Sequence, residues 1–397
     1  MTRYPGIAEY NQAAQHPSTA FTDPELAAGT LATSGLGLPI VLGGGFALTY
    51  TVSMRTRKFA VRCFHRYVPD LKQRYAEISD VIGGLGSGYF VSFEYQREGV
   101  RVRSGLYPVV KMAWAEGPTL GAFIEDNYDD GAAMRSLWSS FRELARFLAK
   151  RGIAHGDLEN GNLVVRNGGC LTLIDYDGMY VPGMALGNGN ELGHAHFQHP
   201  GRTPDHFGPR MDDFSFILID LSLDAVARDP SLHERFYNGD DNILFQKPDF
   251  EDPGASAVFR ELRRIRPLAD KLDDFASICR RPIEQVPTLE AFLASHAKPR
   301  ASAVPATTRS VAARPKPDGM SNLDYIRSTL GTLTQAPTSS PSRSAVSEAA
   351  AGQTRIALSD RIAKRASALT HAVDGNWPWW LGMFLCAMFL LMFITSV

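Results

Sequence analysis

The sequence predicts an α+β protein in which a small β-rich lobe precedes a larger helical lobe, with a single transmembrane helix at the C-terminal end. Three observations predict it. Between residues 38 and 114, short apolar runs with strand texture are separated by glycines and charged residues. From Thr119 onward, the texture is mainly helical. From Trp379 to Val397 the chain carries no charge, and at about 1.5 Å per residue such a helix approaches the ~30 Å width of a hydrocarbon core.

The β-rich lobe is expected to contain several strands and one helix. The strand patterns fall at residues 38–42, 46–54, 58–64, 89–96, 100–104 and 106–114. Helical spacing over residues 68–82 places a helix between the third and fourth of these strands. In the following lobe, residues 131–152 predict a long helix with one apolar stripe that ends at Gly152. The stripe consists of Leu137, Phe141, Leu144 and Leu148.

Texture divides the chain into four segments. Residues 1–36 show no sustained period and are interpreted as an N-terminal extension, whereas residues 37–297 are densely patterned and predict the folded domain. Residues 298–375 are rich in Ala, Pro, Ser and Thr, a composition that buries too little apolar surface to offset chain entropy, so we expect a disordered linker. Residues 376–397 are expected to be a single-pass tail anchor, and the basic residues before it place the folded domain on the cytoplasmic side.

Composition narrows the partners. The formal net charge of the 397 residues is −1, so no general positive field attracts nucleic acid, and we expect no such partner. The four cysteines are far apart and none belongs to a C-x-x-C pair, so we expect reduced thiols and neither a disulfide framework nor a zinc site. They are Cys63, Cys170, Cys279 and Cys386.

The strongest functional signal is IAHGDLENGNLVV (153–165) followed by LTLIDYDGMY (171–180). Asp157 and Asn162 are five residues apart in a polar turn between a helix and a strand, and Asp175 follows the next apolar strand. Phosphoryl transfer needs one carboxylate that orients the acceptor hydroxyl and receives its proton. It also needs an amide and a second carboxylate that hold Mg²⁺ on the triphosphate.

This region resembles the catalytic loop of protein kinases, H-R-D-L-x-x-x-N, followed by D-F-G. The positions that match are His155, Asp157, Leu158, Asn162 and Asp175. The resemblance covers about residues 37–297, and its texture is similar to a divergent bacterial group of protein-kinase-like proteins. It implies a bilobal protein-kinase-like fold that binds ATP with Mg²⁺ or Mn²⁺, with Asp157 as the catalytic base and Asn162 and Asp175 as metal ligands.

The resemblance also implies a nucleotide site in the β-rich lobe. Gly43, Gly44 and Gly45 resemble the glycine-rich loop whose backbone approaches phosphates. Met112 and the residues after it resemble the gatekeeper and hinge, so the backbone groups of Ala113 and Ala115 would bind adenine. For the glycines alone, a simple turn between strands is the alternative.

Arg62 stands where the family has a lysine, in F-A-V-R in place of V-A-I-K. Its expected partner is Glu77 on the following helix; the alternative is that Glu77 interacts with an exposed neighbour on its own helix, such as Lys72 or Arg74. Arginine keeps the charge but differs from lysine in bulk and geometry, and in a kinase-like site the change commonly weakens catalysis.

Other departures bear on regulation. Gly156 replaces the family's Arg, and Asp177 intrudes before the glycine of D-F-G. Because residues 175–202 contain no Ser or Thr, we expect no switching by Ser/Thr phosphorylation within that loop. Asp212 resembles the start of the helix that braces the catalytic loop, with a plain N-cap as the alternative. The histidines at 194, 196, 199 and 206 allow a metal site, although polar packing is the favoured interpretation.

Three functions are compatible with this site. The first is a membrane-tethered Ser/Thr protein kinase, with its own Ser/Thr-rich linker, for example residues 338–347, as an accessible substrate. The second is a pseudokinase scaffold that binds nucleotide without turnover. The third is a small-molecule phosphotransferase, because aminoglycoside and choline kinase-like enzymes also have H-G-D in this loop. The segment from Asp212 to Ser215 and the glycine-rich region resemble the protein-kinase type more closely.

Overall fold

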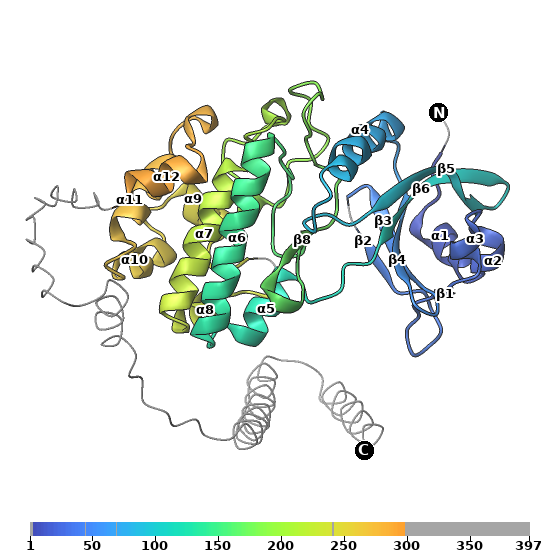
Figure 1. Ribbon diagram of the computed structural model, residues 1–397, viewed down its shortest axis with the longest axis horizontal. Coiled ribbons are helices and arrows are strands. Elements are labelled where there is room, and N and C mark those ends of the chain that lie inside the picture. The colour runs from blue at the N-terminus through green and yellow to red at the C-terminus, as the bar shows by residue number, and fades with distance from the viewer. Residues whose placement is uncertain (1–2, 44, 69, 240–241, 298–397) are drawn as a thin grey trace, which may run out of the picture. The chain divides into compact units, whose positions relative to one another are not determined.

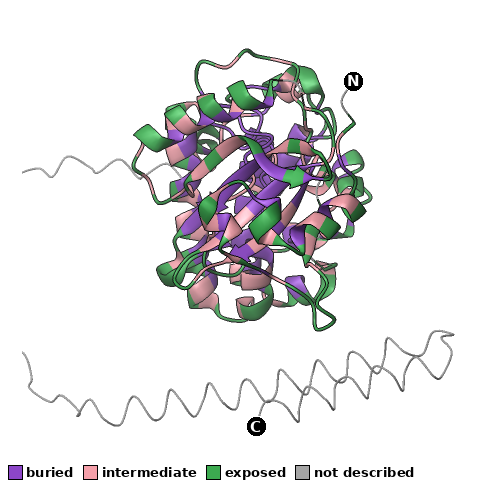
Figure 2. Ribbon diagram, turned by 90° about the vertical axis from the view of Figure 1, so that its right-hand side faces the viewer, coloured by how far each residue is buried: buried purple, intermediate pink, exposed green. Residues whose placement is uncertain are grey.

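The computed structural model describes residues 3–43, 45–68, 70–239 and 242–297. Within them, an N-terminal antiparallel β-sheet is followed by a mostly helical region (Figure 1). The α+β prediction, with its order of lobes, is therefore confirmed at this level. Buried residues gather along the sheet and on the inner sides of the helices, while exposed residues lie on the outside (Figure 2).

The sheet has six strands in the order β1-β3-β4-β6-β5, and β2 also pairs with β3. The strands are β1 (Thr30–Leu31), β2 (Val41–Gly43), β3 (Ala47–Ser53), β4 (Lys58–Phe64), β5 (Phe93–Val102) and β6 (Gly105–Ala113). In the register of β4, Arg62 lies opposite Thr49 on one side and Val110 on the other, which places it at the centre of the sheet. The strands expected at 89–96 and 100–104 form one strand, β5, with an irregularity between Gln96 and Val100.

The N-terminal residues belong to the packing of this sheet. The helices α1 (Ile7–Ala14), α2 (Pro17–Ala20) and α3 (Pro24–Ala27) lie beside it (Figure 1). Tyr10, Phe21 and Leu26 are buried in one apolar cluster with residues of β3 and β4. The ammonium group of Lys111 on β6 lies 2.8 Å from a carboxylate oxygen of Asp23. The segment interpreted as an extension therefore covers part of the sheet and completes its core.

Helix α4 (Leu71–Gly84) contributes to a second hydrophobic cluster, which extends into the helical region. Its apolar positions recur every three or four residues, so that Tyr75, Ile78 and Ile82 are buried on one side. The ring of Tyr75 makes an edge contact with Phe93, with centroids 5.4 Å apart. This packing, together with an edge contact between Tyr75 and Phe64, fixes the helix next to β5 and β4.

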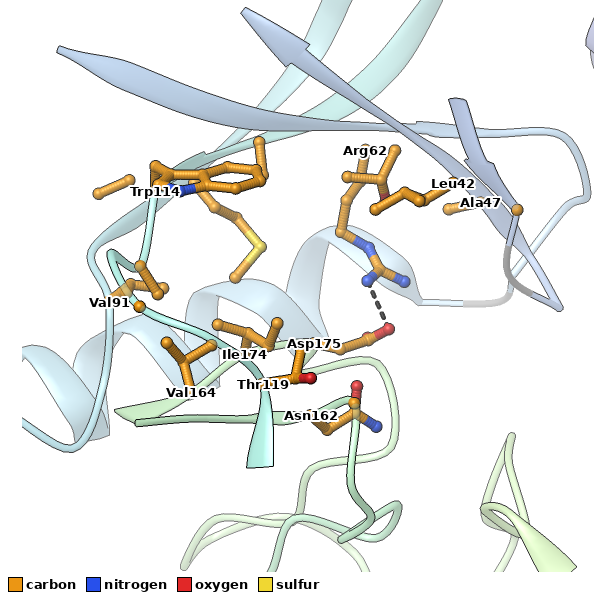
Figure 3. A pocket seen from close by; sticks show the side chains of 18 residues that line it. Leu42, Ala47, Arg62, Val91, Trp114, Thr119, Asn162, Val164, Ile174 and Asp175 are labelled. Carbon is orange, nitrogen blue, oxygen red and sulfur yellow. Dashed lines mark ion pairs between the residues drawn. The ribbon is translucent and has the colours of Figure 1, made fainter. Parts of the chain in front are cut away.

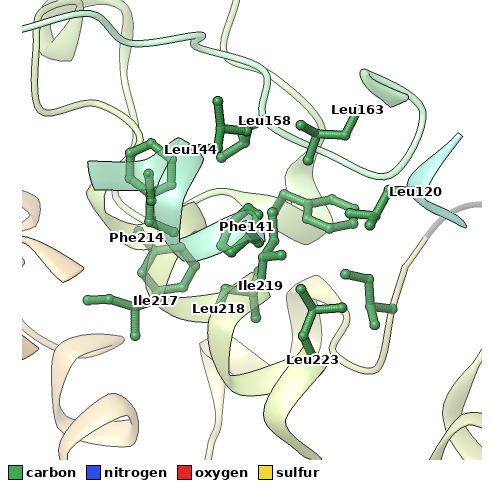
Figure 4. Close-up of a cluster of buried hydrophobic side chains, with 14 of the residues drawn as sticks. Leu120, Phe141, Leu144, Leu158, Leu163, Phe214, Ile217, Leu218, Ile219 and Leu223 are labelled. Carbon is green, nitrogen blue, oxygen red and sulfur yellow. The ribbon is translucent and has the colours of Figure 1, made fainter. Parts of the chain in front are cut away.

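The helical region is organised around two long helices, α6 (Gly131–Arg151) and α7 (Asp213–Arg228). The predicted stripe of α6 is buried in full, and Gly152 ends the helix with a φ of 62°. Leu158 and Leu163, which flank the polar loop between them, lie in the same buried cluster as Phe141 (Figure 4). The short strands β7 (Leu163–Val165) and β8 (Leu171–Leu173) pair with each other, and α5 (Leu120–Asn127) packs on β7. The remaining helices are α8 (Ser231–Phe236), α9 (Lys247–Glu251), α10 (Ala257–Arg263), α11 (Ala269–Ile278) and α12 (Leu289–Ser295).

The predicted linker (298–375) and tail anchor (376–397) lie outside the described residues. Within the described ranges, no helix combines the length and the apolar character that a membrane span requires. Cys63, Cys170 and Cys279 carry free thiols. Cys386 belongs to the part of the chain that the structure does not describe.

Candidate functional site

A cavity of about 300 Å³ lies between the sheet and the loop of residues 153–165 (Figure 3). Its walls are apolar on both sides: Leu42, Ala47 and Ala60 contribute from the sheet, and Val164 and Ile174 from the helical region. Its polar residues are gathered at one end, where Arg62, Asn162 and Asp175 line it. An apolar cavity with charged groups at one end suits a ligand that joins an apolar ring to an anion.

The end of β6 and the two residues after it form the opposite end of this cavity. Met112, Ala113, Trp114 and Ala115 all line it. The backbone N–H of Ala113 donates to the carbonyl of Ser92 at 2.8 Å, and that of Trp114 donates to the carbonyl of Lys58 at 3.0 Å. Both groups are thus used within the sheet. Of the two residues expected to bind a ring through the backbone, Ala115 is the one whose N–H would serve as a donor.

One residue of the glycine run at the end of β2 borders the cavity. Gly43, the last residue of β2, lines it, Gly45 follows in the turn, and Gly44 lies outside the described residues. A Cβ atom built on Gly43 or on Gly45 would meet no heavy atom within 4 Å, and neither residue has a positive φ. Neither a positive φ nor a close contact in the described structure therefore requires glycine at these two positions.

The loop of Asp157 is held by hydrogen bonds within itself and from α7. The Nδ2 group of Asn162 donates to the Asp157 carboxylate at 3.0 Å and to its carbonyl at 2.9 Å. Asp212, the residue before α7, accepts the backbone N–H of His155 and, at 2.9 Å, that of Gly156. Asp212 makes no N-cap hydrogen bond with its side chain, so the interpretation as a brace is confirmed.

Gly156 is required by the backbone. Its φ is 83°, and a Cβ atom there would lie 2.3 Å from the carbonyl oxygen of Gly178. Any side chain would collide with a backbone atom in a conformation that favours glycine. Arginine, or any other residue with a side chain, would therefore be excluded at this position in this chain.

Asp175 and Arg62 face each other across the cavity. A guanidinium nitrogen of Arg62 lies 2.6 Å from a carboxylate oxygen of Asp175 (Figure 3). Asp175 has a φ of 63°, which is uncommon for a residue other than glycine. The same guanidinium also forms an ion pair with the carboxylate of Asp177. One buried cation thus serves two carboxylates, and both come from the D-Y-D-G motif.

The prediction that Arg62 pairs with Glu77 is wrong. Among the described residues, Arg62 pairs with Asp175 and Asp177, while the carboxylate of Glu77 accepts a hydrogen bond from Gln73, one turn away on α4, at 2.8 Å. The physical reason is Asp177, because the second carboxylate of the D-Y-D-G motif already lies beside the guanidinium. The alternative, in which Glu77 interacts with a neighbour on its own helix, agrees better with the structure, although this neighbour is Gln73 and not Lys72 or Arg74.

Helix α4 is tied to the site by other side chains. The hydroxyl of Tyr75 donates to the second carboxylate oxygen of Asp177. The guanidinium of Arg74 donates to the carbonyl of Asp177 at 2.9 Å and to that of Met179 at 2.5 Å. Through these bonds α4 holds the backbone that follows Asp175.

The pKa values follow from this crowding. Burial opposes the charge on Arg62, but the carboxylates of Asp175 and Asp177 outweigh it and raise the pKa of Arg62 above its ordinary range. Burial also opposes the charge on Asp175, and the guanidinium outweighs it, so the pKa of Asp175 is lowered. The pKa of Asp177 is raised by burial and by the neighbouring charge of Asp175. The pKa values of the two carboxyl groups are thus shifted in opposite directions, and the one that is lowered belongs to Asp175, which lines the cavity.

Two parts of the site were not expected from the sequence. Glu191 lies near the three aspartates, and burial, followed by the charges of Asp177, Asp175 and Asp157, raises its pKa to about 8. The backbone N–H of His194 donates to the carboxylate of Asp157 at 2.6 Å. A backbone donor leaves no side-chain signature, and only the four glycines spaced along residues 183–193 mark an unusual loop.

The histidines in this region are used in packing and local hydrogen bonds. His199 accepts the N–H of Gly201 through Nδ1, and its Nε2 lies 3.2 Å from the carbonyl of Ile278. His206 lies 2.8 Å from the hydroxyl of Thr203 and 3.1 Å from Glu284. In the part of the chain that the structure describes, no group of three His, Cys, Asp or Glu side chains is arranged to hold a metal.

A cation at the cavity would depend on two protein ligands. Because Nδ2 of Asn162 donates to Asp157, the oxygen of this amide is the atom left for a metal. Together with the ionised Asp175, it forms an oxygen donor set that suits Mg²⁺ only if ligand phosphates and water complete the shell.

Neither a scan against protein-family models nor a search among curated proteins finds a match to this chain. The residues themselves therefore carry the functional argument.

Proposed function

We propose that this protein has a protein-kinase-like fold and transfers the γ-phosphoryl group of ATP to Ser or Thr hydroxyls of a protein. One observation carries the proposal: a cavity with apolar walls leads to Asn162 and Asp175, and the loop that supplies Asn162 also holds Asp157. These are the groups that phosphoryl transfer uses, since its catalysis consists mainly of positioning and of charge stabilisation.

In this proposal, the adenine ring lies between the apolar walls and binds backbone groups at Ala113 and Ala115. The backbone at Gly43–Gly45 approaches the phosphates. Asn162 and Asp175 would hold Mg²⁺, or Mn²⁺, which when bound neutralises charge on the phosphate oxygens. Asp157 orients the acceptor hydroxyl and receives its proton as the oxygen bonds to the γ-phosphorus and the bond to ADP breaks.

Arg62 would have two partners in turn. Without nucleotide it neutralises Asp175 and Asp177, and with nucleotide its planar guanidinium can also form a fork with phosphate oxygens. The guanidinium stays protonated, because the surrounding carboxylates raise the pKa of Arg62. In this role Arg62 replaces the family's lysine with a group that is broader and less mobile at its end.

A second candidate is a scaffold that binds nucleotide without turnover. The observation that favours it is the ion pair of 2.6 Å between Arg62 and Asp175, because the same carboxylate would have to hold the metal. If the guanidinium does not yield, the metal cannot approach Asp175. ATP could then enter the apolar cavity without its phosphates reaching a reactive arrangement.

We also infer where the protein is located: a single-pass membrane anchor at residues 376–397 holds the kinase-like domain on the cytoplasmic side. The linker before it contains many Ser and Thr residues, including those at 338–347, and is the most accessible protein substrate, in the same chain or in a neighbouring one.

The test is the transfer of label from γ-³²P-ATP in the presence of Mg²⁺ or Mn²⁺, with the wild type, Asp157→Ala and Arg62→Lys side by side. A working kinase labels protein, and Asp157→Ala abolishes labelling while nucleotide binding stays. More label with Arg62→Lys would show that Arg62 restrains the site. Nucleotide binding without label in any of the three proteins would establish the scaffold. ATP consumption only after a small acceptor is added would indicate a small-molecule phosphotransferase.

A further inference from the structure

Residues 191–194 return to the side of Asp157 that faces away from Asn162. The N–H of His194 donates to Oδ1 of Asp157 at 2.6 Å. On the other side, Nδ2 of Asn162 donates to Oδ2 at 3.0 Å. Each carboxylate oxygen thus accepts one hydrogen bond from a different segment. Since a carboxylate oxygen can accept two, each retains a free lone pair.

Gly193 brings this donor into place. Its φ is 76°, and a Cβ atom there would lie 2.6 Å from Nε2 of Gln198, 2.7 Å from the carbonyl oxygen of Gly156 and 2.9 Å from Oδ1 of Asp157. The position therefore requires glycine for two reasons, the backbone conformation and the approach of the base itself. Nearby Gly187 has a φ of 75°, but its nearest atom, the carbonyl oxygen of Asp205, is 3.7 Å away from such a Cβ.

The segment is anchored to the helical region just after His194. The carbonyl of Phe197 accepts the hydroxyl of Ser215 on α7 at 2.6 Å. The side chain of Gln198 accepts a guanidinium N–H of Arg202 at 2.8 Å, and the same Arg202 nitrogen donates to the carbonyl of Met211 at 2.9 Å. Phe197, Gln198 and Arg202 are all buried. The donor is thus presented by a packed part of the fold, which gives it a fixed direction.

We propose that Gly193 and the backbone N–H of His194 position Asp157. Gly193 allows the chain to approach the carboxylate and the N–H fixes its direction, so neither residue contributes side-chain chemistry. The inference rests on the proposed function, in which Asp157 accepts the proton. Without the donor, the carboxylate can rotate about its bond to the loop, and the acceptor hydroxyl loses its direction toward phosphate. Because residues 175–202 contain no Ser or Thr, docking of this backbone, in place of a loop phosphate, would complete the site.

The main test removes the single N–H. His194 has a φ of −70°, which proline adopts, so His194→Pro keeps the backbone direction, deletes the donor and puts the ring Cδ where Oδ1 of Asp157 now lies, which displaces the carboxylate. We expect kcat for labelling to fall about 10- to 100-fold, as for a displaced catalytic group, while the KM for ATP changes less than about threefold. His194→Ala, which keeps the N–H, should recover most of the lost kcat.

Two matched controls separate this effect from damage to the loop. Ala195→Pro introduces the same ring one residue later, at the exposed first position of a short helical turn, where proline is well tolerated and the Asp157 contact is untouched. Gly193→Ala and Gly187→Ala impose the same backbone strain, and only the first crowds Asp157. The inference predicts large kcat losses for His194→Pro and Gly193→Ala alone. Equal losses in each pair would overturn it.

Amide hydrogen exchange at His194 separates failure of this inference from failure of the proposed function. The contact predicts slow exchange in the full-length wild type and fast exchange in Asp157→Ala. A protein that shows this difference but never labels would retain the positioning contact and refute the kinase function. Labelling that depends on Asp157, together with fast exchange at His194 in the wild type, would refute the inference and leave the kinase function intact.

Discussion

The two sides of the cavity hold their functional residues in different ways. On the helical side, Asp157 and Asn162 are five residues apart in one loop and bond to each other. On the sheet side, Arg62 bonds to Asp177, 115 residues further along the chain. The first arrangement is set by a short stretch of sequence. The second depends on how the small lobe and the helical region are packed against each other.

This difference explains where Asp177 acts. A residue on β4 needs an anionic partner, and a glutamate on a packed helix can provide it only if the helix presents that face to the strand. Here α4 instead presents Tyr75, which bonds to Asp177, and Asp177 neutralises Arg62. Helix α4 and strand β4 are therefore still connected, but through Asp177 of the D-Y-D-G motif. The site should respond strongly to changes at the motif and weakly to changes at Glu77.

The largest expected effect is at Asp175, where both sides of the cavity meet. Asn is nearly isosteric with Asp and tolerates the left-handed backbone at this position, so Asp175→Asn should fold. It removes the charge that would hold a divalent cation. We expect Mg²⁺-dependent ATP binding to be lost and labelling to fall at least about 100-fold, the scale of losing an electrostatic contact in a reactive site. Calorimetric titration of ATP with and without Mg²⁺ measures the binding. Unchanged Mg²⁺ dependence would mean that Asp175 serves only as the partner of Arg62.

The next largest effect is on stability, and it differs between variants at Asp177 and at Glu77. Asp177→Ala leaves the buried guanidinium with one carboxylate and the hydroxyl of Tyr75 without its acceptor, so the free energy of unfolding should fall by about 2 kcal/mol, somewhat less than for a buried charge left with no partner. Glu77→Gln changes a helix surface contact and should stay within about 0.5 kcal/mol of the wild type. Urea denaturation of both variants provides the comparison. A larger loss with Glu77→Gln would restore the helix glutamate as the structural partner.

The sequence predicts those parts of the fold that depend on neighbours along the chain. The strand at 58–64 and the long helix at 131–152 are found within a residue of their expected bounds, because period and the terminal glycine identify them. The brace from Asp212 was also expected, because a motif marks it. The pair between Arg62 and Asp177 and the donor at His194 were not, because a partner across the fold or a backbone N–H leaves no local pattern. The packing of residues 3–31 on the sheet escaped prediction for a similar reason, since its helices are too short to show a period.

A smaller effect concerns the carboxyl group of Glu191. Its pKa is raised to about 8 in the folded protein from an ordinary value of 4.5, so the folded state binds this proton more tightly than the unfolded state does. Its contribution to stability is full below about pH 4.5 and is lost as the pH rises through 8. Glu191→Gln cannot ionise, so it should be more stable than the wild type by about 1–3 kcal/mol at pH 8, less than the full linkage value because the group is partly exposed.

Denaturation curves at pH 4.5 and pH 8 measure the change, and the difference between the two proteins should shrink at the lower pH. Glu284 is a control of opposite sign, because a backbone hydrogen bond and His206 lower its pKa. Replacing it with Gln should cost stability at pH 8 and not at low pH. A constant offset for Glu191→Gln at both pH values would show that Glu191 ionises normally.

The smallest expected effect distinguishes a ligand-binding turn from an ordinary one. Gly43→Ala adds a methyl group in open space at the edge of the cavity, so the free energy of unfolding should stay the same or rise by about 0.5 kcal/mol through the unfolded state. The same methyl group would crowd a phosphate that lies against the backbone, so ATP binding should weaken about three- to tenfold, equivalent to about 1 kcal/mol. Gly35→Ala is the matched control, because it also faces open space but does not line the cavity. If both variants bind ATP as the wild type does, glycine at 43 serves the turn alone, and the sheet side of the cavity approaches its ligand through Arg62 and not through the backbone.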